Sequence, residues 1–152
     1  PGETGGRDSL LAAAHVLRAD EREAEMLTGS RLDTPQEALR AAAGLLERGP
    51  SLVALAAGQA GNAFAWPGGE LFLPLTPAPV ADTTGAGDAF TAGLITALVQ
   101  GSPPERAARL AVAAAGATVG HPGGRPNLTR QTLARQLAQL PGPAPAPGPG
   151  TS

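Results

Sequence analysis

The sequence predicts an α/β fold with a mainly parallel sheet. Two observations lead to this prediction. Short apolar runs bounded by turn residues alternate along the chain with longer segments that carry helix-start signals. In addition, the run "SLVALAAG" (51–58) is apolar without alternation, as expected of a parallel strand covered on both faces. The length of 152 residues fits one domain with its own core, and the sequence contains no internal repeat.

The first elements are short. Residues 8–17 predict a helix that leads into a strand at Val16 to Arg18. Residues 20–29, "DEREAEMLTG", predict a short acidic helix that ends at Gly29, because glycine readily adopts the left-handed conformation that follows many helices.

The helix predicted over residues 33–49 has the clearest boundaries. Thr34 is the expected N-cap, Pro35 suits the first helical position, and Glu37 completes a capping box. Gly49 is the expected end of this helix.

The remaining elements follow the strand at 51–58. Residues 61–66 and 70–75 predict a hairpin around Pro67-Gly68-Gly69. Three further helices are expected, over 89–101, 105–120 and 129–140. The first of them is apolar on nearly all sides and is expected to be buried. We interpret residues 1–140 as one domain and the Pro/Gly/Ala-rich segment 141–152 as a disordered tail.

Composition excludes several function classes. The net charge is −2, from 11 basic and 13 acidic residues, which gives no basic surface for nucleic acid. The sequence has no Cys, so thiolate catalysis, disulfides and Cys-ligated zinc are excluded. The first residues lack the pattern of a signal peptide, and no apolar run is long enough to cross a membrane. We therefore expect a soluble, cytoplasmic protein.

The stretch "DTTGAGDAF" (82–90) is the main candidate for chemistry. The small residues Gly85 to Gly87 let the backbone approach a ligand, and the helix that begins there points unpaired N–H groups into the turn. Such an arrangement binds anions, phosphate above all. Asp88 beside an anion site suggests a general base that takes the proton of an attacking hydroxyl. The alternative is that Asp88 only caps the helix in an ordinary turn.

Four segments together resemble one family. "DTTGAGDAFTAGL" (82–94) resembles the C-terminal signature of the ribokinase (PfkB-type) family of sugar and nucleoside kinases. "ADEREAEMLTG" (19–29), "LVALAAGQAG" (52–61) and "AAAGATVGHPGGRPN" (113–127) resemble other segments of that family, in the same order. The resemblance covers about residues 8–140. It implies a ribokinase-like, doubly wound α/β fold, of which this chain is the C-terminal portion.

The resemblance also implies the reaction. Asp88 would be the general base for a sugar hydroxyl that receives a phosphoryl group from ATP. The backbone N–H groups of Gly85, Ala86 and Gly87 would form the anion hole for that phosphoryl group.

Two cation roles are implied in the same way. Asp82 aligns with a carboxylate that binds a monovalent cation, usually potassium, although a turn residue at the end of a strand is the alternative. The remaining oxygens would come from Thr84, Val119, His121, Gly123 and Asn127. His121 aligns with a position that contributes mainly its backbone, so a catalytic histidine is the weaker interpretation. Glu23 aligns with the residue that organises Mg²⁺ near the phosphates.

The implied nucleotide contacts include departures from the family pattern. ATP would be bound by Asp20, Glu23, Gly58, Gly61, Gly87, Val112 and Gly116, with residues 112–116 against adenine. Asp20 replaces the usual Asn and adds negative charge near the triphosphate. Ala56 replaces the usual Thr and removes one hydrogen bond, which contributes about 1 kcal/mol.

The sugar-binding half of the family is not recognisable in this sequence. The sugar Asp, the Gly-Gly motif and the β-sheet lid have no counterpart, and the first strands of the sheet are absent. We therefore expect an apolar open sheet edge, a ribokinase-like sugar as the partner of the whole enzyme, and a homodimer as one option for its assembly. The alternatives are a truncated, non-catalytic nucleotide-binding or interaction module and, less favoured, an unrelated phosphate-binding α/β protein.

Overall fold

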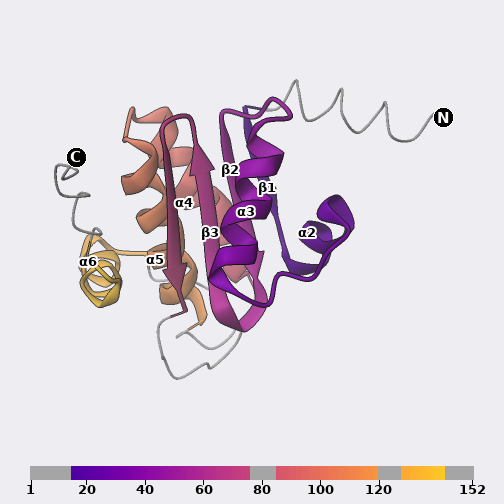
Figure 1. The fold of residues 1–152 in the computed structure, drawn as a ribbon. Coiled ribbons are helices and arrows are strands. Elements are labelled where there is room, and N and C mark those ends of the chain that lie inside the picture. Colours follow the sequence, from indigo (N-terminus) through magenta and orange to yellow (C-terminus); the bar gives the residue numbers. More distant parts are fainter. Residues whose placement is uncertain (1–14, 76–84, 120–127, 143–152) are drawn as a thin grey trace, which may run out of the picture.

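A computed structural model describes residues 15–75, 85–119 and 128–142 (Figure 1). The described strands are β1 (Val16–Ala19), β2 (Leu52–Ala57), β3 (Gly61–Trp66) and β4 (Gly69–Pro74). The helices are α2 (Glu21–Thr28), α3 (Pro35–Leu46), α4 (Ala86–Val99), α5 (Pro104–Val119) and α6 (Arg130–Gln139), with a 3₁₀ turn η1 (Gly58–Ala60).

The four strands form one sheet in the order β1-β2-β3-β4. β1 is parallel to β2, because α2 and α3 carry the chain back to the starting end of the sheet. β3 is antiparallel to both β2 and β4, because η1 and the turn Pro67-Gly68 are too short for a crossover. The predicted hairpin is confirmed, and the sheet described here is mixed, with its parallel pair at β1 and β2.

Helices cover both faces of the sheet. Val53, Leu55 and Ala57 of β2 pack with α2 and α3 on one face. Leu52 and Ala54 pack with α4, α5 and α6 on the other face. In Figure 1, α3 lies in front of the sheet, with α4 and α5 behind it. Apolar and polar residues do not alternate in β2 because helices cover both of its faces, as the sequence predicted.

The helix boundaries follow local signals. Thr34 caps α3, and its hydroxyl accepts from the N–H of Glu37 while the Glu37 carboxylate accepts from the N–H of Thr34. Gly29 ends α2 in the left-handed conformation, with φ 72°. Helix α3 ends at Leu46, before the predicted Gly49, because the chain turns through Glu47 and Arg48.

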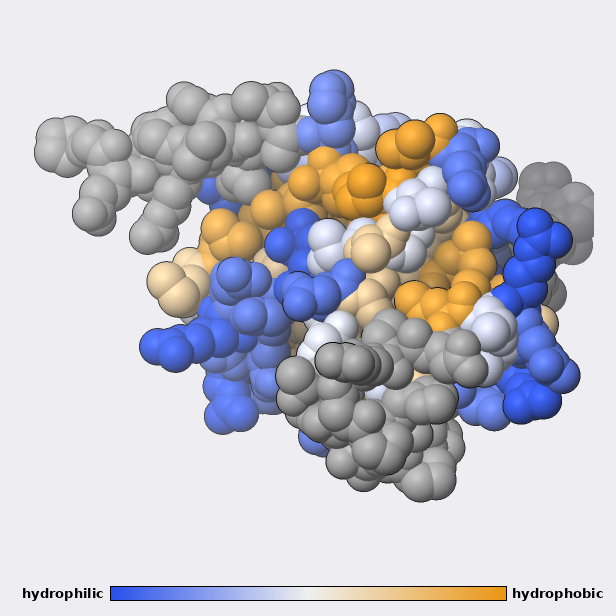
Figure 2. All heavy atoms as spheres, turned by 180° about the vertical axis from the view of Figure 1, so that it is seen from behind, coloured by the Kyte–Doolittle hydropathy of each residue, from blue (hydrophilic) through white to orange (hydrophobic). Residues whose placement is uncertain are grey.

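Two expectations are corrected by the packing. Helix α4 is not buried on all sides: Ile95 and Val99 are 42% and 82% exposed, since no described element covers the outer face of α4. Figure 2, seen from behind, shows apolar surface on this side of the molecule. His15 does not lie in a helix; it is exposed directly before β1, and its carbonyl accepts from Ser51 and Leu52.

Some expectations fall on other parts of the chain. Residues 8–14 of the predicted first helix and residues 143–152 of the predicted tail lie outside the described residues. None of the helices in the described ranges combines the length and the apolar character that a membrane crossing requires.

Candidate phosphate-binding site at the start of helix α4

Helix α4 begins with a glycine in a conformation that other residues avoid. Gly85 is the N-cap, with φ 80° and ψ −4°. The first helical hydrogen bond runs from the N–H of Ala89 to the carbonyl of Gly85, at 2.9 Å. The N–H groups of Ala86, Gly87 and Asp88 therefore have no partner within the helix and point out of its positive end. This turn has the backbone geometry of an anion site.

Asp88 does not occupy the N-cap. Asp88 is the third residue of α4 and is exposed. The N-cap is Gly85, so no side chain caps this helix. Within the described ranges, the Asp88 carboxylate accepts no hydrogen bond and joins no ion pair. Its carboxylate is thus available to a ligand beside the anion site.

Arg18 is a feature of this site that sequence reasoning missed. Its guanidinium carbon lies 5.7 Å from the ring centroid of Phe90 in α4. The Nη2 atom lies 3.2 Å from the position that a Cβ on Gly87 would occupy. The available signal was strand alternation: Leu17 and Ala19 belong to one face of β1, so Arg18 must point to the other.

Asp20 and Glu23 form the capping box of α2. The Asp20 carboxylate accepts from the N–H of Glu23 at 2.8 Å, and the Glu23 carboxylate accepts from the N–H of Asp20 at 2.9 Å. This arrangement explains both residues structurally, and their nucleotide and magnesium roles remain predictions. Nowhere in the described ranges do three or more acidic or histidine side chains gather closely enough to hold a metal ion.

The turn after β2 brings Gly58 and Gly61 to different neighbours. Gly58 has φ 49°, and the Glu21 carboxylate lies 2.6 Å from the position of a Cβ there. Gly61 has φ 136°, and a Cβ there would stand 2.3 Å from the carbonyl oxygen of Leu73. Gly61 is therefore required by strand pairing whether or not a nucleotide binds. Glu21 is exposed, and its carboxylate covers the predicted nucleotide turn.

The predicted adenine segment lies on α5. Val112 is 7% exposed and packs in the core between the sheet and the helices. Gly116 is half-buried, and the side-chain oxygen of Gln136 in α6 lies 2.8 Å from the position of a Cβ on it. A side chain at position 116 would displace Gln136, so the glycine leaves room for α6.

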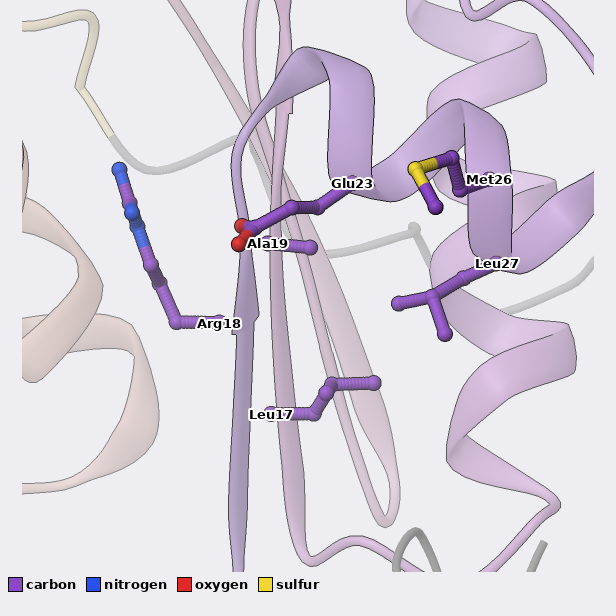
Figure 3. Close-up of a pocket in the computed structure, with 6 residues that line it drawn as sticks. All are labelled: Leu17, Arg18, Ala19, Glu23, Met26 and Leu27. Atoms are coloured by element: carbon purple, nitrogen blue, oxygen red, sulfur yellow. The ribbon is translucent and has the colours of Figure 1, made fainter. Parts of the chain in front are cut away.

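A hollow of about 310 Å³ lies beside β1 and α2. Its lining consists of Leu17, Arg18, Ala19, Glu23, Met26 and Leu27 (Figure 3). In Figure 3 the Arg18 side chain extends to one side of β1, and Leu17 and the three α2 side chains lie on the other. Within the described sheet β1 pairs only with β2, so the hollow lies at an open sheet edge of the kind that the sequence predicted.

Most of the predicted cation ligands are not described. Val119 is the last residue of α5 and is half-buried. The other predicted ligands lie outside the described residues: Asp82, Thr84, His121, Gly123 and Asn127. Trp66 packs on the hairpin, where a Cβ at Gly69 would stand 2.6 Å from the indole.

A family model and several relatives match the chain. The model of the pfkB family of carbohydrate kinases matches residues 6–131. Ribokinase of Haemophilus influenzae is 32% identical over 125 residues, covering 82% of this chain and 41% of that protein. Ribokinase of Arabidopsis thaliana is 33% identical over 145 residues, covering 91% and 38%. The chain thus spans about two fifths of the length of these relatives.

Solved structures match in fold. The structure of Arabidopsis thaliana ribokinase complexed with ribose and ATP has a TM-score of 0.71 and 32% identity, and the match covers 86% of this chain and 43% of that one. Phosphofructokinase-2 from Escherichia coli, in complex with potassium, has a TM-score of 0.75 and 21% identity, with coverages of 87% and 43%. The second similarity is a similarity of fold.

Proposed function

This chain belongs to the pfkB family of carbohydrate kinases, and we propose that it carries the phosphoryl-transfer part of an ATP-dependent sugar kinase. The observation that carries the proposal is the start of α4, where unpaired N–H groups and the exposed Asp88 carboxylate lie within one helical turn. That combination suits a reaction in which an anionic group is transferred to a hydroxyl.

The proposed step uses Asp88 as the general base. The oxygen of the sugar hydroxyl attacks the γ-phosphorus of ATP, and the bond from that phosphorus to the bridging oxygen breaks, so that ADP leaves with the bonding electrons. The hydroxyl proton passes to the Asp88 carboxylate. The N–H groups over residues 85–88 donate to the phosphoryl oxygens as their charge is redistributed.

The nucleotide and ions are assigned to the predicted residues. Asp20, Glu23, Gly58, Gly61, Val112 and Gly116 would lie along ATP, with Glu23 organising Mg²⁺, which neutralises phosphate charge when bound. Asp82, with oxygens of Thr84, Val119, His121, Gly123 and Asn127, would hold potassium beside the anion hole. These donors are oxygens, which suit hard cations. The similar ribokinase is complexed with ribose and ATP, and the phosphofructokinase-2 of the same fold is in complex with potassium, which supports this assignment.

A ribose-like sugar is the proposed substrate of the whole enzyme, since two relatives above 30% identity are ribokinases. A cytoplasmic location and a homodimeric whole enzyme belong to the same proposal. Sedimentation velocity on the longest natural polypeptide containing this sequence would test the dimer; a purely monomeric species would contradict it.

The test of Asp88 is ADP release with a panel of sugars, measured on the longest natural polypeptide that contains this sequence. Asp88→Asn should lower the turnover rate by about 10²–10⁴-fold, because it removes the proton acceptor, while ATP affinity stays nearly unchanged. The matched control is Asp33→Asn, an exposed Asp before α3, on the opposite face of the sheet. Retained turnover in Asp88→Asn would show that another group is the base. No turnover in the unmodified protein would favour the non-catalytic module.

A second arm of the same assay compares potassium with a large inert cation at equal ionic strength. Potassium should raise the turnover rate, and Asp82→Ala should abolish that response. An unchanged response in Asp82→Ala would contradict the cation site without touching the assignment of Asp88.

A further inference from the structure

Arg18 occupies an electrostatically unusual position. The positive end of a helix favours anions, with a partial charge of about half a proton charge. The Arg18 guanidinium nevertheless lies against the first turn of α4, with Nη2 3.2 Å from the position of a Cβ on Gly87. Two positive groups thus lie side by side, an arrangement that costs free energy unless an anion lies between or beside them.

No described carboxylate compensates for this charge. Arg18 takes part in none of the ion pairs between described residues, and Asp88 in the same helical turn does not pair with it. Glu23 lines the same hollow and its carboxylate extends from α2 toward β1 (Figure 3), but that carboxylate accepts from the N–H of Asp20 and forms no ion pair with Arg18. Arg18 is also half-buried, so water screens its charge only in part.

The surroundings hold the guanidinium in place. The ring of Phe90 lies under it at 5.7 Å, and Phe90 in turn stacks on Phe64 of β3, with ring centroids 5.9 Å apart. Phe64 is fully buried, and Phe90 is 6% exposed. A guanidinium that rests on a buried aromatic pair is preorganised, and its planar fork matches the oxygens of a phosphate.

We propose that Arg18 binds the terminal phosphate of the nucleotide at the start of α4, as a phosphate contact in addition to the N–H groups of the anion hole. This inference rests on the proposed kinase function. It gives Gly87 a second role, since any side chain at that position would meet the guanidinium. ADP lacks the γ-phosphate that Arg18 would contact, so Arg18 should strengthen the binding of ATP more than the binding of ADP.

The test is calorimetric titration of ATP and of ADP, each with MgCl₂, into the longest natural polypeptide that contains this sequence. Arg18→Met keeps most of the stem that packs on Phe90 and removes the charge. We expect it to weaken ATP binding by about 10-fold or more, because a charge-assisted hydrogen bond to phosphate is lost, while ADP affinity changes by less than about 3-fold. Arg18→Lys should recover part of the ATP affinity.

The matched control is Arg106→Gln. Arg106 is exposed near the start of α5, and α5 follows the end of α4 that is far from Gly87. At a rise of 1.5 Å per helical residue, the length of α4 places that end about 20 Å from Gly87. This variant should bind both nucleotides as the unmodified protein does. A thermal melt accompanies each variant, because a purely structural Arg18 would change the melting temperature without changing the ratio of ATP to ADP affinity.

Three outcomes separate the hypotheses. A selective loss of ATP affinity in Arg18→Met supports the assignment. Equal losses for ATP and ADP, or no loss, would overturn it while leaving the proposed kinase function intact. If the unmodified protein binds neither nucleotide, the proposed function fails and the role of Arg18 fails with it.

Discussion

Gly61 lies at the start of β3, where the backbone of β3 approaches β4 closely. Its φ is 136°, and a Cβ on it would stand 2.3 Å from the carbonyl oxygen of Leu73 and 2.7 Å from the Cα of Pro74. Backbone atoms cannot move aside as a flexible side chain can, so two independent costs meet at this position: the dihedral strain and the overlap.

We predict that Gly61→Ala lowers the free energy of unfolding by at least about 1–3 kcal/mol. The matched control is Gly68→Ala in the hairpin turn, which has φ 87° but no atom within 4 Å of a Cβ. Gly68→Ala introduces the dihedral strain without the overlap, so it should lower the free energy of unfolding less than Gly61→Ala does. Urea denaturation measures both, and equal losses would show that the contact with Leu73 is not what requires glycine.

At the scale of elements, α2 and α3 begin with the same device. Asp20 with Glu23, and Thr34 with Glu37, are capping boxes in which each side chain accepts from the backbone N–H of the other. The two capping boxes differ in the function predicted for their surroundings. The cap of α2 is part of the predicted nucleotide region, whereas α3 carries no predicted ligand contact.

A pair of substitutions separates capping from nucleotide binding. Asp20→Asn keeps an N-cap oxygen and removes the charge, so stability should change by only a few tenths of a kcal/mol while ATP binds more tightly. Asp20→Ala removes the cap and should cost about 0.5–2 kcal/mol. Thr34→Ala should lose similar stability without changing ATP affinity. Thermal melts and ATP titrations give both readouts, and unchanged ATP affinity in Asp20→Asn would refute the nucleotide role.

At the scale of the whole molecule, the two helical layers share one sheet. Strand β2 contributes Val53 and Leu55 to the layer of α2 and α3, and Leu52 and Ala54 to the layer of α4 to α6. Loss of either layer would expose one face of the same strand. Such sharing favours cooperative unfolding in one step.

The single tryptophan makes this testable, because Trp66 packs with the layer of α4 to α6 while circular dichroism reports the helices of both layers. We predict that the urea transitions seen by Trp66 fluorescence and by far-UV circular dichroism coincide. Two midpoints would show that the layers unfold separately. Repeating the measurement at two protein concentrations tests for association through the open edge of β1, which would shift both midpoints together.

The sequence by itself determined what depends on neighbouring residues. The capping box at Thr34, the left-handed Gly29, the hairpin turn and the glycine turn before Asp88 each rest on a few consecutive residues, so their patterns can be read directly. The family resemblance was also readable, because its motifs are contiguous.

Tertiary structure decided which distant residues meet. Arg18 lies against Gly87, Glu21 covers Gly58, and Gln136 covers Gly116, although each pair is separated along the chain by strands or helices. The tertiary structure also decided that the outer face of α4 is exposed, whereas the sequence predicted a buried helix. These contacts depend on strand order and on the packing of helices against a shared sheet, whereas a local pattern fixes only which face of an element is apolar.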